Sequence, residues 1–407
     1  MPLKVIDQEQ SGREWASPAR EAASQPVASS TPARWVLVAG DFTRHGGMDR
    51  ANYALAEFLA RTGDRVELVT HRAAAELSGL RDVSTHRVLR PLASHFLGSW
   101  WLSRAGRNHA RSAGVQVVAN GGNCPVSKAN WVHYVHAAYR PDLPSSRLRR
   151  WKSGLTRPID LRAERGAVGS AQVVICNSNR TRRDVIKHLG IAPDRAKTIY
   201  YGCDGAQFRP AAPAERARLR EQFGWPAGRP VVLFIGALGD RRKGFDTLFR
   251  AWQLLCSRSE WEALLVVAGQ GAELPLWRRR VVDAGLSDHV RLLGFRTDIP
   301  ELVRAADALA HPARYEAYGL GVQEALCCGL PAIVSASAGI AERYSDDLSD
   351  LLLNDPDDAI ELADRLRNWR ENCEALASRS GPLADKLRAR SWDDMAREIR
   401  DTVLALT

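Results

Sequence analysis

The chain has 407 residues, of which 45% are hydrophobic and 26% are charged, so it is long enough for two globular domains. No apolar run approaches the roughly 18 residues of a membrane-spanning helix, and the start lacks the apolar core of a secretion signal, so we expect a cytoplasmic protein. The seven cysteines lack C-x-x-C spacing, so we expect neither a disulfide framework nor a zinc site. The net charge of +10 suits an anionic partner: nucleic acid, an anionic membrane face or a phosphorylated small molecule.

The N-terminal half alternates short apolar runs with one strongly helical segment. Residues 1–33 are rich in Ser, Ala, Pro and Gln, which predicts a flexible tail. The apolar runs that follow predict buried parallel strands over residues 35–40, 65–70, 115–120, 130–136, 171–178 and 196–202. A helix is predicted over residues 51–63. Residues 71–114 have a less regular hydrophobic pattern, and helices or loops are expected there.

Gly46 and Gly47 stand between the first predicted strand and this helix. Backbone N–H groups at such a helix entrance can bind an anion, although a tight turn explains two glycines equally well. The half contains no G-x-G-x-x-G motif, which argues against an ordinary dinucleotide site.

Pro210, Pro213, Pro226 and Pro230 predict a domain boundary near residues 205–230. Beyond it, strands are predicted over residues 230–238, 263–269, 289–295, 307–312, 331–335 and 350–355, and helices over residues 244–256, 274–285 and 298–306. Residues 359–406 have a helical pattern, and a break in the helix is predicted near Gly381-Pro382. This alternation predicts the α/β class, with two Rossmann-like, doubly wound parallel-sheet domains facing a cleft.

The stretch IGALGDRRKGFDTL, residues 235–248, joins a strand to a helix through Arg241, Arg242 and Lys243. A basic loop beside a helix N-terminus predicts a socket for a diphosphate, and a solvated basic turn is the alternative. The G-x-x-x-x-G-K-[ST] order of a P-loop is missing.

The stretch RYEAYGLGVQEALCCGLPAIVS places seven residues between Glu316 and Glu324. A helix beginning near Gly319 or Leu320 would direct free N–H groups at a phosphate. The carboxylates would accept hydrogen bonds from hydroxyls instead. A diphosphate flanked by hydroxyls on both sides describes a nucleotide-sugar.

These motifs resemble the retaining glycosyltransferases of the GT-B fold known as glycosyltransferase family 4, whose signature is Glu, seven residues, Glu. Similar text occurs in order at residues 45–70, 170–185, 198–210, 234–248, 266–273, 290–312 and 316–335. The resemblance implies the following layout: tail 1–33, acceptor-binding domain 34–205, linker 206–230, nucleotide-sugar-binding domain 231–385, and a C-terminal helix 386–407 packing back towards the first domain.

By resemblance, Glu324 holds the ribose hydroxyls, Glu316 contacts the donor sugar and Lys243 neutralises the diphosphate. His136 falls where the family places a histidine facing the reacting sugar, and His133 remains an alternative. The other donor-binding positions that the resemblance implies are Gly47, Arg242, Phe295, Arg296, Gly319 and Leu320.

One departure concerns Ala237, because many relatives carry a phosphate-binding arginine directly after the glycine at position 236. Arg241 or Arg242 would have to replace it. The Asp355-Pro356-Asp357 string matches a metal-binding D-x-D motif, but its position before a helix favours capping. The family needs no metal or cofactor.

The resemblance implies transfer of a sugar from a UDP- or GDP-sugar to an acceptor hydroxyl, with retention, in the synthesis of a cell-surface polysaccharide, glycolipid or related glycan. The partners are then the nucleotide-sugar and a glycan or lipid-linked acceptor, with no nucleic acid. The basic segment of residues 147–154 is either a solvated face or a peripheral contact with an anionic membrane at its inner face. The rival functions are a sugar-nucleotide 2-epimerase, a non-catalytic nucleotide-sugar sensor and a basic nucleic-acid binder.

Overall fold

The structure is a computed structural model that describes residues 32–44, 46–91, 95–111, 114–140, 147–239, 241–258 and 260–406. The predicted tail, apart from residues 32 and 33, lies outside these ranges. The side chains of residues 147–156 also lie outside these ranges, and with them the basic segment that was expected to be either a solvated face or a contact with an anionic membrane. In the described part of the chain, no helix combines the length and apolar character needed to cross a membrane.

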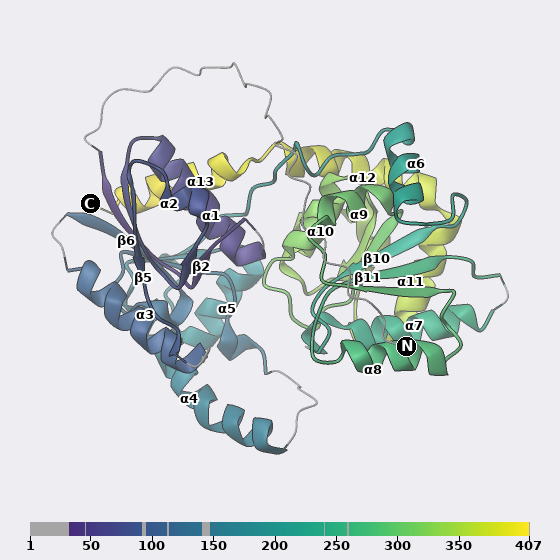
Figure 1. Cartoon of the computed structure of the whole chain (residues 1–407), viewed down its shortest axis with the longest axis horizontal. Coiled ribbons are helices and arrows are strands. Elements are labelled where there is room, and N and C mark those ends of the chain that lie inside the picture. Colours follow the sequence, from purple (N-terminus) through teal and green to yellow (C-terminus); the bar gives the residue numbers. More distant parts are fainter. Residues whose placement is uncertain are drawn as a thin grey trace, which may run out of the picture. The chain divides into compact units, whose positions relative to one another are not determined.

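The first sheet has seven parallel strands in the order β5-β3-β1-β6-β7-β8-β9 (Figure 1). The strands are β1 (Arg34–Val38), β3 (Arg65–Thr70), β5 (Val83–Arg87), β6 (Val115–Asn120), β7 (Ala129–Val132), β8 (Val173–Cys176) and β9 (Ala196–Thr198), with the separate pair β2 (Asp41–Phe42) and β4 (Arg72–Ala73) beside them. Both faces of β1 are buried, because Trp35 and Leu37 belong to one hydrophobic cluster and Val36 and Val38 to another. A continuous apolar run such as this one is typical of a parallel strand covered on both sides.

Helices cover both faces of the first sheet. They are α1 (Gly47–Arg61), α2 (Ala75–Ser78), α3 (His95–His109), α4 (Arg147–Ser170) and α5 (Asn179–Leu189). In Figure 1, α1 and α2 lie on one face, and α3, α4 and α5 lie on the other. Two layers of helices around a parallel sheet give the doubly wound arrangement that the sequence predicts.

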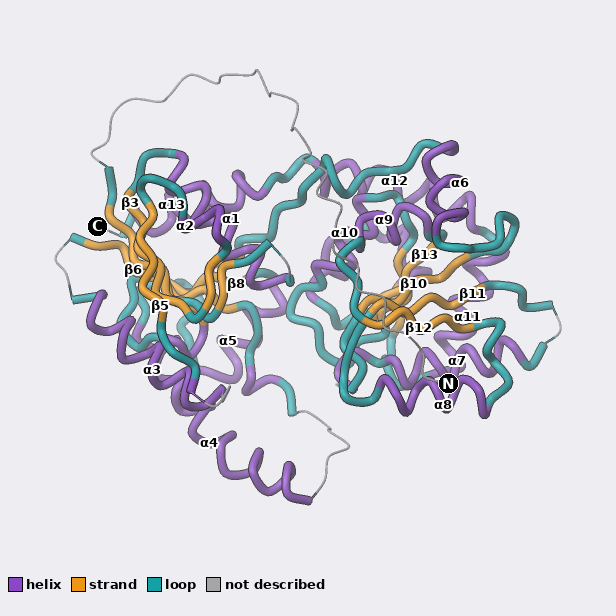
Figure 2. The backbone as a smooth tube through the Cα atoms, in the orientation of Figure 1, coloured by secondary structure: helices purple, strands orange, loops and turns teal. Residues whose placement is uncertain are grey.

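The second sheet has six parallel strands in the order β12-β11-β10-β13-β14-β15 (Figure 2). The strands are β10 (Val231–Ile235), β11 (Leu264–Ala268), β12 (Val290–Gly294), β13 (Ala308–His311), β14 (Ala332–Ser335) and β15 (Leu352–Leu353). Its helices are α6 (Pro213–Gln222), α7 (Phe245–Cys256), α8 (Leu274–Asp283), α9 (Ile299–Ala305), α10 (Leu320–Cys327), α11 (Ala359–Glu371) and α12 (Cys373–Arg388). Figure 2 shows α7, α8 and α11 on one face and α6, α9, α10 and α12 on the other. The predicted class, two Rossmann-like parallel-sheet domains, is therefore confirmed.

The chain ends in α13 (Trp392–Leu404), which packs against α1 of the first half. Ser391 and Asp394 form a capping box that starts this helix. Arg400 Nε donates to the buried Asp64 carboxylate at 2.7 Å, and the Trp35 indole N–H donates to the same group at 3.0 Å. The C-terminal segment is thus tied to the first sheet.

Three local predictions differ from the structure. The predicted strand at residues 130–136 ends at Val132, because the chain then turns and the Glu164 carboxylate accepts from the backbone N–H groups of His136 and Ala137. The predicted break near Gly381-Pro382 is wrong, because α12 continues through both residues. The stretch predicted as linker contains α6, which packs against α9.

Proline inside a helix costs about 3 kcal/mol, so α12 needs compensating contacts. They come from its buried face, where Leu376, Leu383 and Leu387 pack into the main core. Burial of a leucine side chain contributes about 1.5–3 kcal/mol. Three such side chains outweigh one missing backbone hydrogen bond, which explains why composition alone gave the wrong boundary.

The strand order fixes where a ligand can bind. In each sheet the chain first adds strands on one side of its first strand and later adds strands on the other side. The change of side occurs at β1, which lies between β3 and β6, and at β10, which lies between β11 and β13. Ligands in such folds bind beyond the carboxyl ends of the strands at these points. The loop containing Gly46 and Gly47 follows β1, and the loop ending at Lys243 follows β10. Topology therefore selects the two loops that the motifs had singled out.

Candidate functional site

A cleft of about 840 Å³ is lined by residues from both halves of the chain. The lining from the first half includes Gly47, Arg50, His133, Asn177 and Tyr201, and from the second half Lys243, Phe295, Arg296, His311, Glu316, Gly319, Leu320 and Glu324. Most of these residues stand just after a strand or at the start of a helix, as the topology requires.

Glu316 lies at the centre of a cluster of charged and polar side chains. Lys243 Nζ donates to Glu316 Oε2 at 2.5 Å, and His311 Nε2 lies 3.0 Å from the same oxygen. The Glu316 side chain is only 12% exposed and that of Lys243 18%. This largely buried salt bridge forms part of the lining of the cleft.

The protonation states in this cluster follow from burial and charge. Burial raises the pKa of Glu316, but Lys243, His311 and Arg242 together hold that pKa far below its usual value. Burial also lowers the pKa of His311, helped by the charges of Lys243 and Arg242 and opposed by Glu316. The cluster thus contains an ionised Glu316 that accepts from a neutral His311 and from the Lys243 ammonium group.

Lys243 is placed by the residue that follows it. The single turn Arg241–Lys243 ends at Gly244, which has φ +72° and precedes α7. A Cβ at Gly244 would lie 1.8 Å from the Pro312 carbonyl oxygen, which excludes any side chain there. Gly244 therefore brings the basic loop against the segment that carries Glu316.

Glu324, on α10, carries the second predicted carboxylate of the cleft. Arg50 from α1 lies 3.3 Å from Glu324 and 3.5 Å from Asp204. The Arg50 guanidinium also lies over the rings of Phe208 and Trp392. Burial raises the pKa of Glu324 to about 7, an effect that Arg50 opposes and Asp204 reinforces. Glu324 therefore changes its charge near neutral pH, unlike Glu316.

The start of α10 faces the first glycine loop. As predicted, Glu316 precedes this helix in a loop, and the helix begins at Leu320 after Gly319. An added Cβ on Gly47 would touch the Leu320 side chain at 3.7 Å, so the two loops approach each other across the cleft. Among the described residues no N-cap side chain makes a hydrogen bond to this helix start, and unpaired N–H groups at such a position can bind an anion.

The other predicted donor residues divide into two groups. Phe295 and Arg296 line the cleft, where Arg296 Nε donates to Asp298 at 2.7 Å. Arg242 is not part of the lining, but its guanidinium lies 3.9 Å from Glu316 and donates to the Tyr315 carbonyl at 3.0 Å. Arg241 is exposed. Of the two candidates to replace the arginine missing at Ala237, Arg242 is the one in contact with the Glu316 cluster.

The two histidines are placed differently. His133 is buried, lines the cleft, and its Nδ1 lies 2.5 Å from the Tyr201 hydroxyl. Its Nε2 has no hydrogen-bond partner among the described residues, and burial lowers its pKa to about 3. His136 is outside the lining, its side chain is 61% exposed, and its Nδ1 lies 3.1 Å from Glu164. The structure thus brings His133 into the cleft and leaves the favoured His136 outside it.

The Asp355-Pro356-Asp357 string does not cap the next helix itself. Asp358 caps α11, and its carboxylate accepts from the N–H groups of Ile360 and Glu361. Asp357 instead pairs with Arg314 at 2.6 Å. Within the described ranges, no group of three or more His, Cys, Asp or Glu side chains is arranged to hold a metal ion.

Two family models match the chain, one in each half. The model described as "Glycosyltransferase Family 4" matches residues 45–207, and that described as "Glycosyl transferases group 1" matches residues 215–381. The chain belongs to glycosyltransferase family 4, the group 1 glycosyltransferases. It is therefore a glycosyltransferase, as its motifs predict.

Curated relatives and solved structures agree with this family. A D-inositol 3-phosphate glycosyltransferase of Xylanimonas cellulosilytica is 28% identical over 403 residues, covering 89% of this chain and 92% of the relative. Sucrose-phosphate synthase from Thermosynechococcus elongatus has a TM-score of 0.74 at 20% identity and covers 92% of this chain and 99% of its own. HepE of Anabaena in complex with UDP-glucose has a TM-score of 0.71 at 19% identity, covering 91% and 99% of the two chains. These structures confirm the GT-B fold.

Sequence reasoning missed several residues in the cleft of this family 4 member. Arg50 stands three residues after Gly47, so its place on the first turn of α1 was a usable signal. His311 ends β13 directly before the Glu316 loop, and a polar residue closing an apolar strand was a second signal. Asn177 and Tyr201 lie in stretches that resemble the family, at residues 170–185 and 198–210, but the resemblance assigned no role to either residue.

Proposed function

We propose that this glycosyltransferase moves a sugar from a nucleoside diphosphate sugar, UDP- or GDP-linked, to an acceptor hydroxyl with retention of anomeric configuration and without a metal ion. The Glu316 cluster beside the start of α10 carries the proposal. Lys243 and the helix N-terminus supply positive potential for a diphosphate, and Glu316 and Glu324 supply acceptors for hydroxyls on either side.

In the proposed reaction, the bond from the anomeric carbon to the diphosphate oxygen breaks, and a bond to the acceptor oxygen forms on the same face of the sugar. The acceptor proton passes to the departing phosphate oxygen. Lys243 and the N–H groups at the start of α10 stabilise the charge that gathers on that phosphate. Glu316 is held ionised by its partners, which suits it to accept from sugar hydroxyls rather than to transfer a proton.

The relatives favour a UDP-linked donor for the first tests. HepE of Anabaena was solved with UDP-glucose and with UDP and glucose, and its fold matches 91% and 92% of this chain in those two structures. The acceptor class, a glycan or a lipid-linked sugar, and the peripheral contact with a membrane remain predictions.

The function is tested by a thermal-shift screen of UDP-, GDP- and ADP-sugars, followed by transfer assays with and without EDTA. We expect one nucleotide-sugar to stabilise the protein, transfer to proceed in EDTA, and NMR of the product to show the anomeric configuration of the donor. Inverted product would contradict retention, and loss of activity in EDTA would contradict metal independence. Conversion of the donor to a sugar epimer without an acceptor would favour the 2-epimerase, and binding without turnover the sensor.

Donor affinity should depend on pH through Glu324, whose pKa is about 7 in the free protein. Ribose hydroxyls donate to the ionised carboxylate, so affinity is highest above pH 7 and falls as the carboxyl is protonated below it. Calorimetry with a nucleotide-sugar should show affinity about tenfold lower at pH 6 than at pH 8. A nucleotide-sugar is the right probe, because a terminal phosphate would itself titrate near 6. Glu324→Gln should remove this dependence, and an unchanged profile in that variant would assign it elsewhere.

The two histidines provide a matched pair of variants. We propose that His133 faces the reacting sugar, because its Nε2 has no partner among the described residues and the residue lines the cleft. His133→Ala should lower kcat about fivefold to tenfold, the scale of one neutral hydrogen bond, and His136→Ala should change kcat less. The opposite ranking would return the role to His136.

A further inference from the structure

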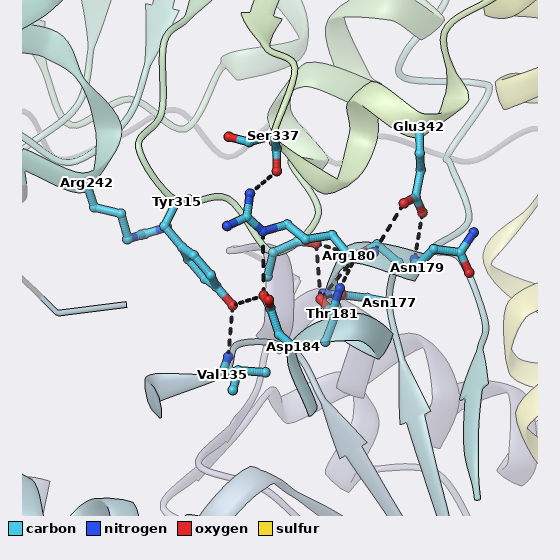
Figure 3. A network of polar contacts seen from close by, with 12 residues as sticks. Val135, Asn177, Asn179, Arg180, Thr181, Asp184, Arg242, Tyr315, Ser337 and Glu342 are labelled. Carbon is cyan, nitrogen blue, oxygen red and sulfur yellow. Dashed lines mark hydrogen bonds and ion pairs between the residues drawn. The ribbon is translucent and has the colours of Figure 1, made fainter. Parts of the chain in front are cut away.

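The hydroxyl of Tyr315 joins three separate segments of the chain (Figure 3). It donates to Asp184 Oδ2 on α5 at 3.0 Å and accepts from the Val135 backbone N–H at 3.4 Å. Tyr315 directly precedes Glu316 and is 1% exposed. Val135 lies between His133 and His136, so one hydroxyl connects the Glu316 loop, the histidine loop and α5.

The residue on the other side of Glu316 is held by the same helix. Ser178, which caps α5, donates its hydroxyl to the Ala317 carbonyl at 2.5 Å, and Thr181 donates to it at 3.1 Å. The packing is close, since a Cβ on Gly339 would lie 2.1 Å from the Ala317 oxygen. Both sequence neighbours of Glu316 are therefore anchored to the first turns of α5, which belongs to the first half of the chain.

Charged groups around this contact are balanced. The Arg180 guanidinium lies 4.5 Å over the Tyr315 ring and 3.5 Å from Asp184, and it donates to the Ser337 carbonyl. The Glu342 carboxylate accepts from the N–H groups of Asn179 and Arg180 at 2.7 and 3.2 Å (Figure 3). The anchor is a network of ion pairs and hydrogen bonds, in which the buried Arg180 Nε makes no hydrogen bond to the described residues. Directional polar contacts of this kind fix geometry more sharply than apolar packing does.

We propose that Tyr315 is a positioning residue for glycosyl transfer: through its hydroxyl it holds Glu316 and the histidine loop in one mutual geometry. The inference rests on the proposed function, in which Glu316 contacts the donor sugar. Loss of the hydroxyl leaves the charge of Glu316 intact, because Lys243 and His311 remain its partners. What changes is the orientation of Glu316 relative to the first half of the chain, and misplaced groups lower the rate of the chemical step.

The test compares Tyr315→Phe with Tyr344→Phe. Tyr344 also donates a hydrogen bond, to the Ala332 carbonyl at 2.8 Å, but it lies outside the cleft lining and makes its bond within the second half. Tyr315→Phe should lower kcat about tenfold and weaken the binding of UDP-glucose relative to UDP. Tyr344→Phe should change neither quantity beyond about twofold.

Asp184 supplies a rescue experiment on the partner side. Asp184→Asn keeps an oxygen that accepts from the Tyr315 hydroxyl, whereas Asp184→Ala removes it. We expect kcat to fall about tenfold in Asp184→Ala and to recover substantially in Asp184→Asn. In the double variant Tyr315→Phe/Asp184→Ala the two losses should not add, because both remove the same contact.

The outcomes separate the inference from the proposed function. If wild type transfers sugar but Tyr315→Phe matches Tyr344→Phe in kcat and in both affinities, the positioning role is wrong and the function stands. If Tyr315→Phe weakens UDP as much as UDP-glucose, its role is merely structural and the inference also fails. If wild type shows neither transfer nor binding of any nucleotide-sugar in the screen, the proposed function itself falls.

Discussion

Lys243→Ala is expected to lower kcat for glycosyl transfer about 100- to 1,000-fold at saturating donor, the scale for removing one preorganised electrostatic contact. In the free protein Lys243 neutralises Glu316 at 2.5 Å, and in the proposed complex it also faces the departing diphosphate. Charge on that diphosphate grows as the sugar leaves. The loss should therefore affect kcat more than the donor KM.

Two further variants control this prediction. Lys243→Arg keeps the charge and should retain more activity than alanine, although its planar head cannot reproduce the geometry of an ammonium group. Arg279→Ala removes an exposed positive charge on α8, outside the cleft lining, and should leave kcat within about twofold. Near-native turnover of Lys243→Ala with saturating donor would remove Lys243 from the mechanism.

Glu324→Ala is expected to weaken donor binding by about 1.5–3 kcal/mol, or about 10- to 150-fold in Kd, the range for a hydrogen bond to a charged group. The fold should tolerate the change, because Arg50 keeps Asp204 as a partner at 3.5 Å. The variant should therefore lose affinity without losing stability. The Kd for the nucleotide-sugar, measured by calorimetry, should rise strongly, and the melting temperature should change little.

Glu215→Ala is the matched control for Glu324→Ala. Glu215 is likewise paired with arginines, Arg209 at 2.8 Å and Arg304 at 3.1 Å, but it does not line the cleft. Its removal should leave nucleotide-sugar affinity unchanged. An unchanged affinity in Glu324→Ala as well would show that this carboxylate does not hold the donor.

The sequence predicted the parts of the fold that depend on local pattern. Buried strands such as Val231–Ile235 are continuous apolar runs, and helix starts such as that of α10 are marked by glycine, so periodicity and turn chemistry sufficed to find them. The motif around Glu316 and Glu324 also predicted that the first would lie in a loop and the second on a helix.

Features that depend on distant partners could not be predicted in this way. His136 leaves the strand because Glu164, 28 residues further along the chain, accepts from its backbone N–H. The anchoring of Tyr315 depends on Asp184 and Val135, which lie more than 100 residues earlier. Arg50 reaches Glu324 only because the two sheets place α1 and α10 on the same cleft. No periodicity in the sequence encodes such pairs.

Arg50 has a consequence for the free enzyme. Arg50 forms an ion pair with the Glu324 carboxylate, to which the ribose hydroxyls of the proposed donor would bind. Arg50 also forms an ion pair with Asp204, which does not depend on Glu324. Donor binding should then transfer Arg50 from Glu324 towards Asp204. A structure of the complex would show this exchange.

A crystal structure of the protein with the nucleoside diphosphate selected by the screen tests the central claim most directly. We predict the diphosphate between Lys243 and the start of α10, the ribose hydroxyls on Glu324, and Arg50 released from that carboxylate. A nucleotide bound elsewhere, or bound in the cleft with Glu324 still paired to Arg50 and Lys243 away from the phosphates, would contradict the account.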